Sequence, residues 1–263
     1  MKPLAELTKA DIKNIKLVCF DVDGVTIKKG TIIREEETRQ TTTLTLKTRL
    51  LTKDVKEKLI EIKKYFFVAI NSGRSTIYLK DVFGDLLWEN IALIGEVGIF
   101  TLSRGELVQH EKFDSGTLSK MRNIRFKLEK YADESRVSEA FEPKQFLITL
   151  HTKSEDKKVY EIVKGVDPEG EFSVIWSGEA FDILPSRLNK GTALVNLCLY
   201  LNLNPSQTIA IGNGDNDRDM IDTAGIGVTT EPEVLKADYY TSTSKEEHLG
   251  GIELIDKLLE LIK

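Results

Sequence analysis

A run of acidic residues in the stretch IGNGDNDRDM (211–220) has the composition of a metal-binding loop. Asp215, Asp217 and Asp219 occupy alternate positions in it. Carboxylate oxygens are hard ligands that suit Mg²⁺ better than zinc, so the run predicts a site for a divalent cation. Asn213 stands where a further carboxylate would serve such a site, and it raises the question of whether the ion can still be held.

Two more acids stand in the stretch DVDG (21–24), directly after an apolar run. Alternate residues of a strand point to opposite sides, but Gly24 permits a bend that lets both carboxylates reach one pocket. Asp21 could then attack a phosphorus atom and form an aspartyl-phosphate, while Asp23 moves a proton. Because a phosphate and Asp21 repel each other, this chemistry also requires cations, for which Mg²⁺ and a lysine are suited.

Each of these patterns also has a plainer interpretation. Two aspartates before a glycine often form only a turn, and Ser72 in the stretch NSGR (71–74) could simply cap the next helix. A calcium loop is excluded, because Met220 and Ile226 stand where that loop needs its glycine and its glutamate. A Walker phosphate loop is absent, since no glycine–lysine–Ser/Thr run follows a strand.

The polar stretches follow apolar, β-branched runs that are typical of buried strands. The expected strands lie within residues 16–24, 65–74, 91–94, 208–217 and 225–230, and the expected helices span 52–64, 75–83, 191–201, 218–223 and 252–262. This alternation predicts an α/β fold with a parallel, Rossmann-like sheet covered by helices on both faces. Ligands bind beyond the carboxyl ends of such strands, so we expect the loops at 21–24, 71–74 and 212–217 to converge.

Residues 98–184 mix strand-like and helical segments in a different pattern. A hairpin-like start, two helical segments and further strands fall at 98–113, 118–131, 155–164, 145–152 and 171–184. The pattern predicts a small α+β cap domain (98–184) inserted into a discontinuous core (1–97 and 185–263). The threonine-rich residues 30–50 suit a projecting β-hairpin and a solvated loop about equally well.

Composition limits the classes of partner. The chain has 263 residues, 41% of them hydrophobic and 30% charged, with a formal net charge of −5. Such a balance gives no electrostatic reason to expect nucleic acid or an anionic membrane as partner. No segment resembles a membrane span, and residues 1–16 lack the apolar core of a signal peptide, so a cytoplasmic protein is expected.

The residues with sulfur or imidazole side chains offer no alternative chemistry. Cys19 and Cys198 stand among apolar neighbours, and we expect two buried thiols rather than a disulfide. His110, His151 and His248 are isolated along the chain, so the sequence shows no His-based metal site or catalytic dyad.

Taken in order, the polar segments resemble the four motifs of the haloacid dehalogenase superfamily of phosphotransferases. DVDGV resembles the first motif, INSGR the second, LNKGTAL the third and IGNGDNDRDM the fourth. The stretch FDILPSRLNKGTAL is similar to the sugar-phosphatase and phosphoglycolate-phosphatase-like branch with a C2-type cap between the second and third motifs. The resemblance covers nearly the whole chain, and four motifs in order are far more specific than one.

This resemblance implies a role for each matching residue. Asp21 would be the nucleophile, and Asp23 the general acid and then base, with its backbone carbonyl facing Mg²⁺. Ser72 would hold the phosphoryl oxygens, and Lys190 would offset charge between Asp21 and the phosphate. Asp217 would belong to the metal shell. A lysine at a helix start is unfavourable against the helix dipole unless an anion is near, which also favours a functional Lys190.

Further contacts with the substrate are expected from Gly73 and Arg74, although a surface arginine is an equal alternative. Asp182 and Glu179, near the expected junction of cap and core, are candidate substrate contacts or solvated acids. The cofactor implied by the resemblance is Mg²⁺, and the partner is a small phosphorylated metabolite.

Asn213 departs from the pattern of the resembled family, whose fourth motif has an aspartate at this position. An amide oxygen can still ligate Mg²⁺, but without charge, so the metal is expected to bind more weakly or to be replaced by another divalent ion. The expected metal set is Asp21, Asp23, Asn213 and Asp217, with Asp215 in reserve on the same loop. Val25, where many relatives have threonine, is expected to affect packing only.

The function expected from these residues is Mg²⁺-dependent hydrolysis of a phosphomonoester through an aspartyl-phosphate. A phosphomutase of the same superfamily is an alternative that the motifs barely separate from it. A metabolite-binding or scaffold protein that has lost efficient chemistry is the alternative from another class, and Asn213 motivates it. In that case residues 30–50 could serve a homo-oligomer or a partner; the sequence gives neither the oligomeric state nor the substrate.

Overall fold

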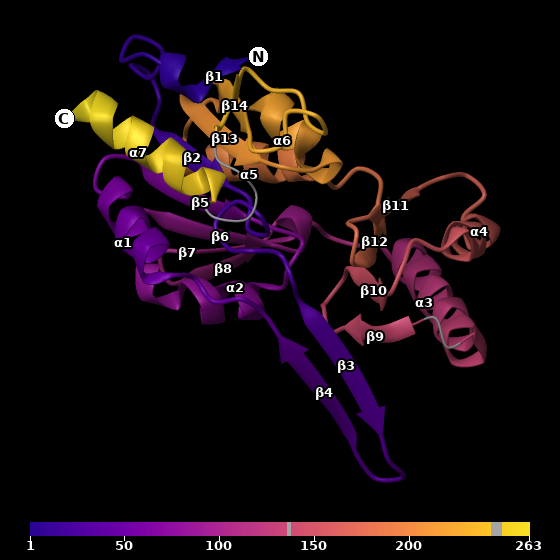
Figure 1. The fold of residues 1–263 in the computed structure, drawn as a ribbon. Helices are drawn as coiled ribbons and strands as arrows, with labels where there is room; N and C mark the ends of the chain where they lie inside the picture. The colour runs from indigo at the N-terminus through magenta and orange to yellow at the C-terminus, as the bar shows by residue number, and fades with distance from the viewer. Residues whose placement is uncertain (136–137, 243–248) are drawn as a thin grey trace. The chain divides into compact units, whose positions relative to one another are not determined.

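The computed structural model describes residues 1–135, 138–242 and 249–263, and the chain divides into two compact units (Figure 1). The first, here called the core unit, comprises Met1–Lys29, Arg49–His110 and Asn189–Lys263. The second, the insert unit, comprises Gly30–Thr48 and Glu111–Leu188. Each unit encloses apolar clusters of its own, so each is described separately below.

A nine-stranded sheet forms the centre of the core unit. All neighbouring strands from β1 to β6 in the sheet order are parallel, and β7 and β8 extend the sheet as an antiparallel hairpin. In sheet order the strands are β1 (Lys2–Pro3), β15 (Tyr239–Tyr240), β14 (Ile226–Thr229), β13 (Thr208–Gly212), β2 (Leu17–Phe20), β5 (Phe67–Asn71), β6 (Ile91–Gly95), β7 (Phe100–Ser103) and β8 (Glu106–Gln109). This sheet confirms the predicted α/β class.

Helices cover both faces of this sheet, because successive residues of each strand point to opposite sides. Val18 and Phe20 of β2 pack in the cluster that includes α1 (Lys53–Ile62), α2 (Thr76–Phe83) and α7 (Gly250–Ile262). Leu17 and Cys19 of the same strand pack in the cluster that includes α5 (Lys190–Leu201) and α6 (Arg218–Thr223). The apolar runs are thus continuous in sequence because the strands are buried on both sides.

The starts of three helices are fixed by polar side chains, which determines where the polar loops end. Thr52 caps α1 and Ser75 caps α2, each accepting a hydrogen bond from a backbone N–H three residues on. Asn189 caps α5 in a capping box with Thr192. Lys190 is consequently the first residue of α5.

The insert unit has a four-stranded antiparallel sheet and two helices, and the helices share one apolar cluster with the sheet. The strands are β11 (Phe172–Trp176), β12 (Ala180–Pro185), β10 (Ile148–Thr152) and β9 (Ser138–Glu142), in sheet order, and the helices are α3 (Ser115–Ser135) and α4 (Lys157–Val166). This is the α+β composition expected for the inserted segment.

The threonine-rich segment forms a β-hairpin, the first of the two forms open to it from sequence. Its strands are β3 (Ile32–Glu37) and β4 (Thr42–Lys47), paired in register from Ile32–Lys47 to Glu37–Thr42. Ile33 is fully buried, whereas all six residues of β4 are exposed.

The unit boundaries differ from the expected ones in two places. Residues 98–110, expected in the cap, pair with β6 and complete the core sheet. Residues 30–48, expected in the core, group with the insert unit instead. A hairpin pattern is local, so the sequence could not indicate the sheet to which either hairpin belongs.

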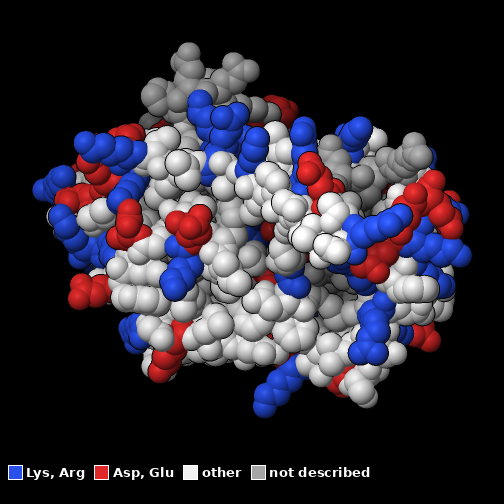
Figure 2. All heavy atoms as spheres, turned by 90° about the horizontal axis from the view of Figure 1, so that it is seen from below, with Lys and Arg blue, Asp and Glu red and all other residues white. Residues whose placement is uncertain are grey.

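The surface carries both signs of charge. Lys and Arg side chains are interspersed with Asp and Glu over the face seen in Figure 2, as a net charge of −5 spread over many ionised residues would give. Among the described residues, no helix has both the length and the apolar character needed to cross a membrane.

Candidate active site

Three polar loops leave neighbouring strands at one edge of the core sheet. β2 lies between β5 and β13, with Phe20 in register with Ile70 on one side and with Ile211 on the other. Asp21, the next residue, donates its backbone N–H to the Ile211 carbonyl at 3.0 Å. The loops after β2, β5 and β13 therefore begin side by side, as parallel strands require.

A buried lysine joins two of these loops. The ammonium of Lys190 donates to one carboxylate oxygen of Asp21 and to one of Asp217, each at 2.5 Å. The side chains of Lys190, Asp21 and Asp217 are only 2%, 6% and 0% exposed. The structure thus brings together three of the residues singled out from sequence, although they are up to 196 positions apart in the chain.

The pKa values of Asp21 and Lys190 are shifted because two carboxylates, those of Asp21 and Asp217, share one ammonium. Burial and the negative charge of Asp217 raise the pKa of Asp21 to about 7, against the opposing influence of Lys190. Burial on its own would lower the pKa of Lys190, but the charges of Asp21 and Asp217 outweigh it and raise that pKa. The site is therefore short of positive charge, and further cationic character beside Asp21 would favour its carboxylate form.

Asp217 is bonded at both of its oxygens. While one accepts from Lys190, the other accepts the backbone N–H groups of Asn213 at 2.9 Å and Gly214 at 3.1 Å. These hydrogen bonds favour a role for Asp217 in holding Lys190 and the loop. The direct ligation of a metal by Asp217 that the sequence predicts stays a prediction.

Asn213 lies against the backbone of the DVDG loop. Its side-chain Nδ2 donates to the backbone carbonyl of Asp23 at 2.9 Å, and the residue is 6% exposed. The contact is close enough that a Cβ on Gly24, whose φ is +83°, would lie 2.3 Å from Nδ2. Gly24 thus provides both the left-handed turn and the space for the amide.

Asp23 pairs with an arginine from the neighbouring loop. Nε and Nη2 of Arg74 donate to the two carboxylate oxygens of Asp23, both at 3.2 Å. The Arg74 side chain is 10% exposed and that of Asp23 28%, and the guanidinium lies 5.1 Å from the centre of the Tyr78 ring. Arg74 is therefore a buried partner of Asp23 and not a surface arginine, and its expected contact with phosphate stays a prediction.

Ser72 is buried at the end of β5 and does not cap the following helix, since Ser75 does so. Its hydroxyl accepts from the N–H of Arg74 at 3.2 Å. Asn71, which sequence reasoning passed over, donates from Nδ2 to the backbone carbonyl of Lys190 at 2.9 Å. Its position next to Ser72 in the NSGR stretch could have indicated a role in the site. Its hydrogen-bond partner could not be predicted, because Lys190 is 119 positions away in the chain.

Three candidate residues have other surroundings. The carboxylate of Asp215 is 76% exposed and pairs with Arg218 at 2.5 Å, so it does not replace the charge missing at Asn213. Asp182 lies on β12 of the insert unit, where it accepts from Thr149 and from Lys144, the latter at 3.3 Å. Glu179, at the turn before β12, is half-buried. Asp182 and Glu179 are thus features of the insert unit.

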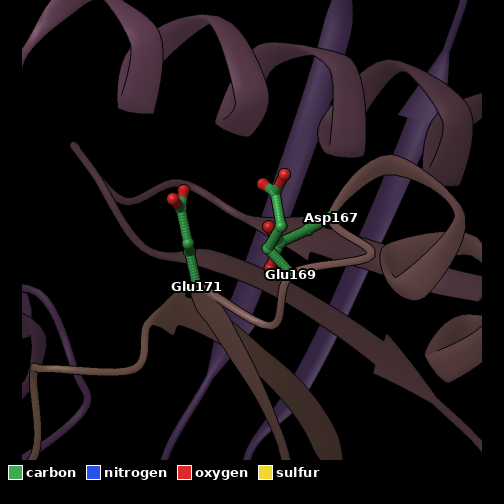
Figure 3. Close-up of side chains that lie close together, drawn as sticks. All are labelled: Asp167, Glu169 and Glu171. Carbon is green, nitrogen blue, oxygen red and sulfur yellow. The ribbon is translucent and has the colours of Figure 1, made fainter.

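A separate group of three acids in the insert unit shares one lysine. Asp167, Glu169 and Glu171 lie side by side in Figure 3. Lys120 donates to all three, at 2.9, 3.1 and 2.6 Å. Glu169 and Glu171 are exposed and Lys120 offsets part of the charge of the group, so these acids are not the candidate for a metal site.

The chemistry of the oxygens around Asp21 fits a hard divalent cation. Among the described residues, neither the second carboxylate oxygen of Asp21 nor the amide oxygen of Asn213 receives a hydrogen bond, although both residues are buried. The carbonyl oxygen of Asp23 lies beside the same amide. Oxygen donors of this kind suit Mg²⁺, which keeps several water molecules and needs few protein ligands.

The expectation for the cysteines is also confirmed. Cys19 and Cys198 are free and buried. Burial raises the pKa of the Cys198 thiol to about 11, and it raises that of Cys19 further, so neither thiol is a nucleophile at neutral pH.

Comparison with known proteins agrees with this geometry. A family described as haloacid dehalogenase-like hydrolase matches residues 30–252. A phosphoglycolate phosphatase from Methanopyrus kandleri is 33% identical over 108 residues, which cover 40% of this chain and 46% of that protein. One from Methanoculleus marisnigri is 42% identical over 90 residues, or 34% and 36% of the two chains. The chain thus spans about half the length, or less, of these relatives.

Solved structures share the fold over nearly the whole chain. The C-terminal domain of trehalose-6-phosphate phosphatase from C. albicans has a TM-score of 0.67, at 17% identity over 99% of this chain and 98% of that one. A haloacid dehalogenase-like hydrolase from Bacteroides thetaiotaomicron has a TM-score of 0.62, at 16% identity over 93% and 99%. With the family match over most of its length, the chain belongs to the haloacid dehalogenase-like hydrolases.

Proposed function

We propose that the protein is a Mg²⁺-dependent phosphomonoester hydrolase that acts on a small phosphorylated metabolite through an aspartyl-phosphate. The observation that carries this proposal is the Lys190 ammonium, held at 2.5 Å from a buried Asp21 at the carboxyl end of a central strand. An isolated buried carboxylate would repel a phosphate, whereas one paired with a fixed cation can approach it.

In this proposal each residue of the site performs one task. Asp21 attacks the phosphorus atom while the bond to the leaving oxygen breaks, and Asp23 gives that oxygen its proton. Asp23 then takes a proton from a water molecule, which attacks the aspartyl-phosphate, releases inorganic phosphate and restores Asp21. Ser72 and the N–H of Gly73 hold phosphoryl oxygens, and Arg74 and Lys190 offset their charge.

The oxygens of Asp21, the Asp23 carbonyl and the Asn213 amide would hold Mg²⁺, which supplies charge neutralisation for the phosphoryl group when bound. Asp217 contributes by fixing Lys190. The Lys190 contact with Asp21 limits that carboxylate to one oxygen for the ion.

The substrate class rests on the relatives. Two of them are named phosphoglycolate phosphatases, and a structural neighbour is named a trehalose-6-phosphate phosphatase. All three names denote a small phosphorylated molecule, so a small phosphorylated metabolite is the substrate class proposed here. We further propose that the insert unit acts as the cap expected from sequence and excludes water from the aspartyl-phosphate.

The neutral Asn213 favours one alternative, a metabolite-binding protein with weak chemistry. Hydrolysis of an aryl phosphate in the presence of Mg²⁺, Mn²⁺ or Co²⁺ separates the two functions. We expect hydrolysis by the natural chain, its loss in Asp21→Asn, and near-normal hydrolysis in Asp215→Asn, because Asp215 is exposed. Lack of hydrolysis with every metal across a panel of phosphorylated metabolites would leave the binding function in its place. Transfer of the phosphoryl group back to a hexose would identify a phosphomutase.

A further inference from the structure

We infer that the divalent cation and the phosphate bind this chain as a coupled pair, each weakly without the other. The inference rests on the proposed function, and it concerns how Asn213 changes the site. With such coupling, the protein without phosphate would bind Mg²⁺ weakly, and the phosphate-bound protein would bind it tightly.

The first argument is the number of charges open to a cation. Three carboxylates lie in the site, but Asp217 is bonded at both oxygens, and Asp23 is paired through both oxygens with Arg74. Asp21 has already given one oxygen to Lys190. One carboxylate oxygen of Asp21 therefore remains, and the other open oxygens belong to neutral groups.

The second argument is that Asn213 already occupies one of the neutral oxygens that could ligate the cation, the backbone carbonyl of Asp23. Its Nδ2 donates to the Asp23 carbonyl at 2.9 Å, so that carbonyl is already satisfied within the protein. A cation at this oxygen must share it with the amide or displace the hydrogen bond, which carries a free-energy cost. An aspartate at this position would carry no such donor and would add a full negative charge beside Asp21.

The third argument is that Asp215, the acid that sequence analysis held in reserve, does not compensate. Asp215 is on the same loop, but its carboxylate points to solvent and pairs with Arg218. A phosphate is therefore the remaining source of anionic oxygens for the cation. The same phosphate would meet the buried carboxylate of Asp21, which repels it, so the phosphate equally needs the cation.

Coupling of this kind must be reciprocal: the factor by which phosphate tightens Mg²⁺ equals the factor by which Mg²⁺ tightens phosphate. Calorimetric titration of the full chain measures both, using Mg²⁺ with and without inorganic phosphate and then phosphate with and without Mg²⁺. We expect each ligand to tighten the other about tenfold or more, within the usual range of coupling between sites.

Asn213→Asp tests the residue itself. Without phosphate, this variant should bind Mg²⁺ about tenfold more tightly than the natural chain, because Coulomb attraction in a buried site is strong. Without Mg²⁺, it should bind phosphate more weakly. Asp215→Asn is the matched control, since it changes the charge of the same loop at an exposed position, and both affinities should stay within twofold, or roughly 0.4 kcal/mol.

Equal Mg²⁺ affinities of the natural chain with and without phosphate would overturn the inference, and so would a folded Asn213→Asp variant with unchanged Mg²⁺ affinity. The measurement on the natural chain decides the question even if the variant does not fold. Aryl phosphate hydrolysis in parallel separates the two proposals. Hydrolysis with uncoupled binding removes only this inference, whereas absence of both hydrolysis and phosphate binding removes the proposed function.

Discussion

At the scale of single residues, Lys190 determines what the site can do. One ammonium serves two buried carboxylates, so the charge of Asp21 and Asp217 is only half neutralised. The consequence is a pKa of Asp21 raised to about 7 by burial and by Asp217. In the proposed reaction Asp21 must be ionised, and this requirement makes additional positive charge at the site part of the chemistry.

This ionisation predicts a pH dependence of stability in the metal-free protein. Asp21 has a reference pKa of 3.8 and a folded-state pKa of about 7, so between these values the unfolded chain releases a proton that the folded chain keeps. Raising the pH from 4 to 7 therefore favours unfolding. The side chain in Asp21→Asn stays neutral at every pH. The free energy of unfolding of this variant, minus that of the natural chain, should therefore rise by roughly 1 kcal/mol per pH unit across this window.

Urea unfolding with a metal chelator at several pH values measures this difference. Asp215→Asn serves as the control and should follow the natural chain throughout, because its side chain is exposed. A difference between Asp21→Asn and the natural chain that stays constant from pH 4 to pH 7 would contradict the raised pKa.

The residue types of the site could be predicted from sequence, but their mutual contacts could not. Asp21 and Asp217 stand in polar stretches after apolar runs, and the roles of Lys190 and Asp217 came from the resemblance to the third and fourth motifs. The structure brings the three residues together. The hydrogen bond from Asn213 to the Asp23 carbonyl depends on how two distant loops pack. Such a partner leaves no mark in the local pattern of either loop.

At the scale of elements, the position of α5 matters most, because it carries Lys190 at its first residue. The capping box of Asn189 and Thr192 fixes where the helix begins. Gly191 then allows α5 to lie close to α6, since a Cβ on it would come within 2.5 Å of the carbonyl oxygen of Asp219. The Lys190 ammonium reaches Asp21 from a helix held in this way.

Gly191→Ala should therefore lower activity more than stability. The added Cβ must push α5 away from α6, and a displacement of about 1 Å at a reacting group can cost on the order of a hundredfold in rate. We expect kcat for aryl phosphate to fall by about tenfold to a hundredfold. Gly165→Ala is the matched control, because a Cβ there meets no atom within 4 Å, and kcat equal to that of this control would refute the role of the close packing.

The long elements were predictable because their apolar residues repeat at the spacing of a buried strand or helix face. β1 and β15 have two residues each and were missed, since so short a strand has no repeat. β7 and β8 were predicted as a hairpin but assigned to the cap. β7 pairs with β6 and β8 pairs with β7, so the core sheet continues for two strands beyond the predicted boundary, and the pattern of a hairpin does not record which sheet it extends.

At the scale of the whole molecule, the chain contains two units with separate apolar interiors. The residues of the candidate active site belong to the core unit, whereas Asp182 lies in the insert unit. Continuous apolar strands indicated the core unit, and the change of pattern after residue 98 indicated an insertion. The hairpins at 98–110 and 30–48 each belong to the other unit than the one expected. The unit boundaries were therefore less predictable than the fold class of each unit.

Separate interiors predict separate losses of stability. Ile209 lies in the core unit and Ile183 in the insert unit, and both are fully buried. Replacing either with alanine should cost about 2–5 kcal/mol. Hydrogen exchange read by mass spectrometry should show faster exchange around β13 in Ile209→Ala and around β12 in Ile183→Ala. Equal loss of protection in both units from either change would show that they unfold as one.

The hairpin strand β4 has a consequence for how the protein behaves at high concentration. Its six residues are all exposed, and only Lys47 among them is charged. A strand edge with few charged residues and no proline is a template onto which another polypeptide can add a strand. At high concentration, copies of this chain should therefore associate most readily by backbone pairing along β4. Self-association and metal binding at Asn213 would then depend on different parts of the sequence.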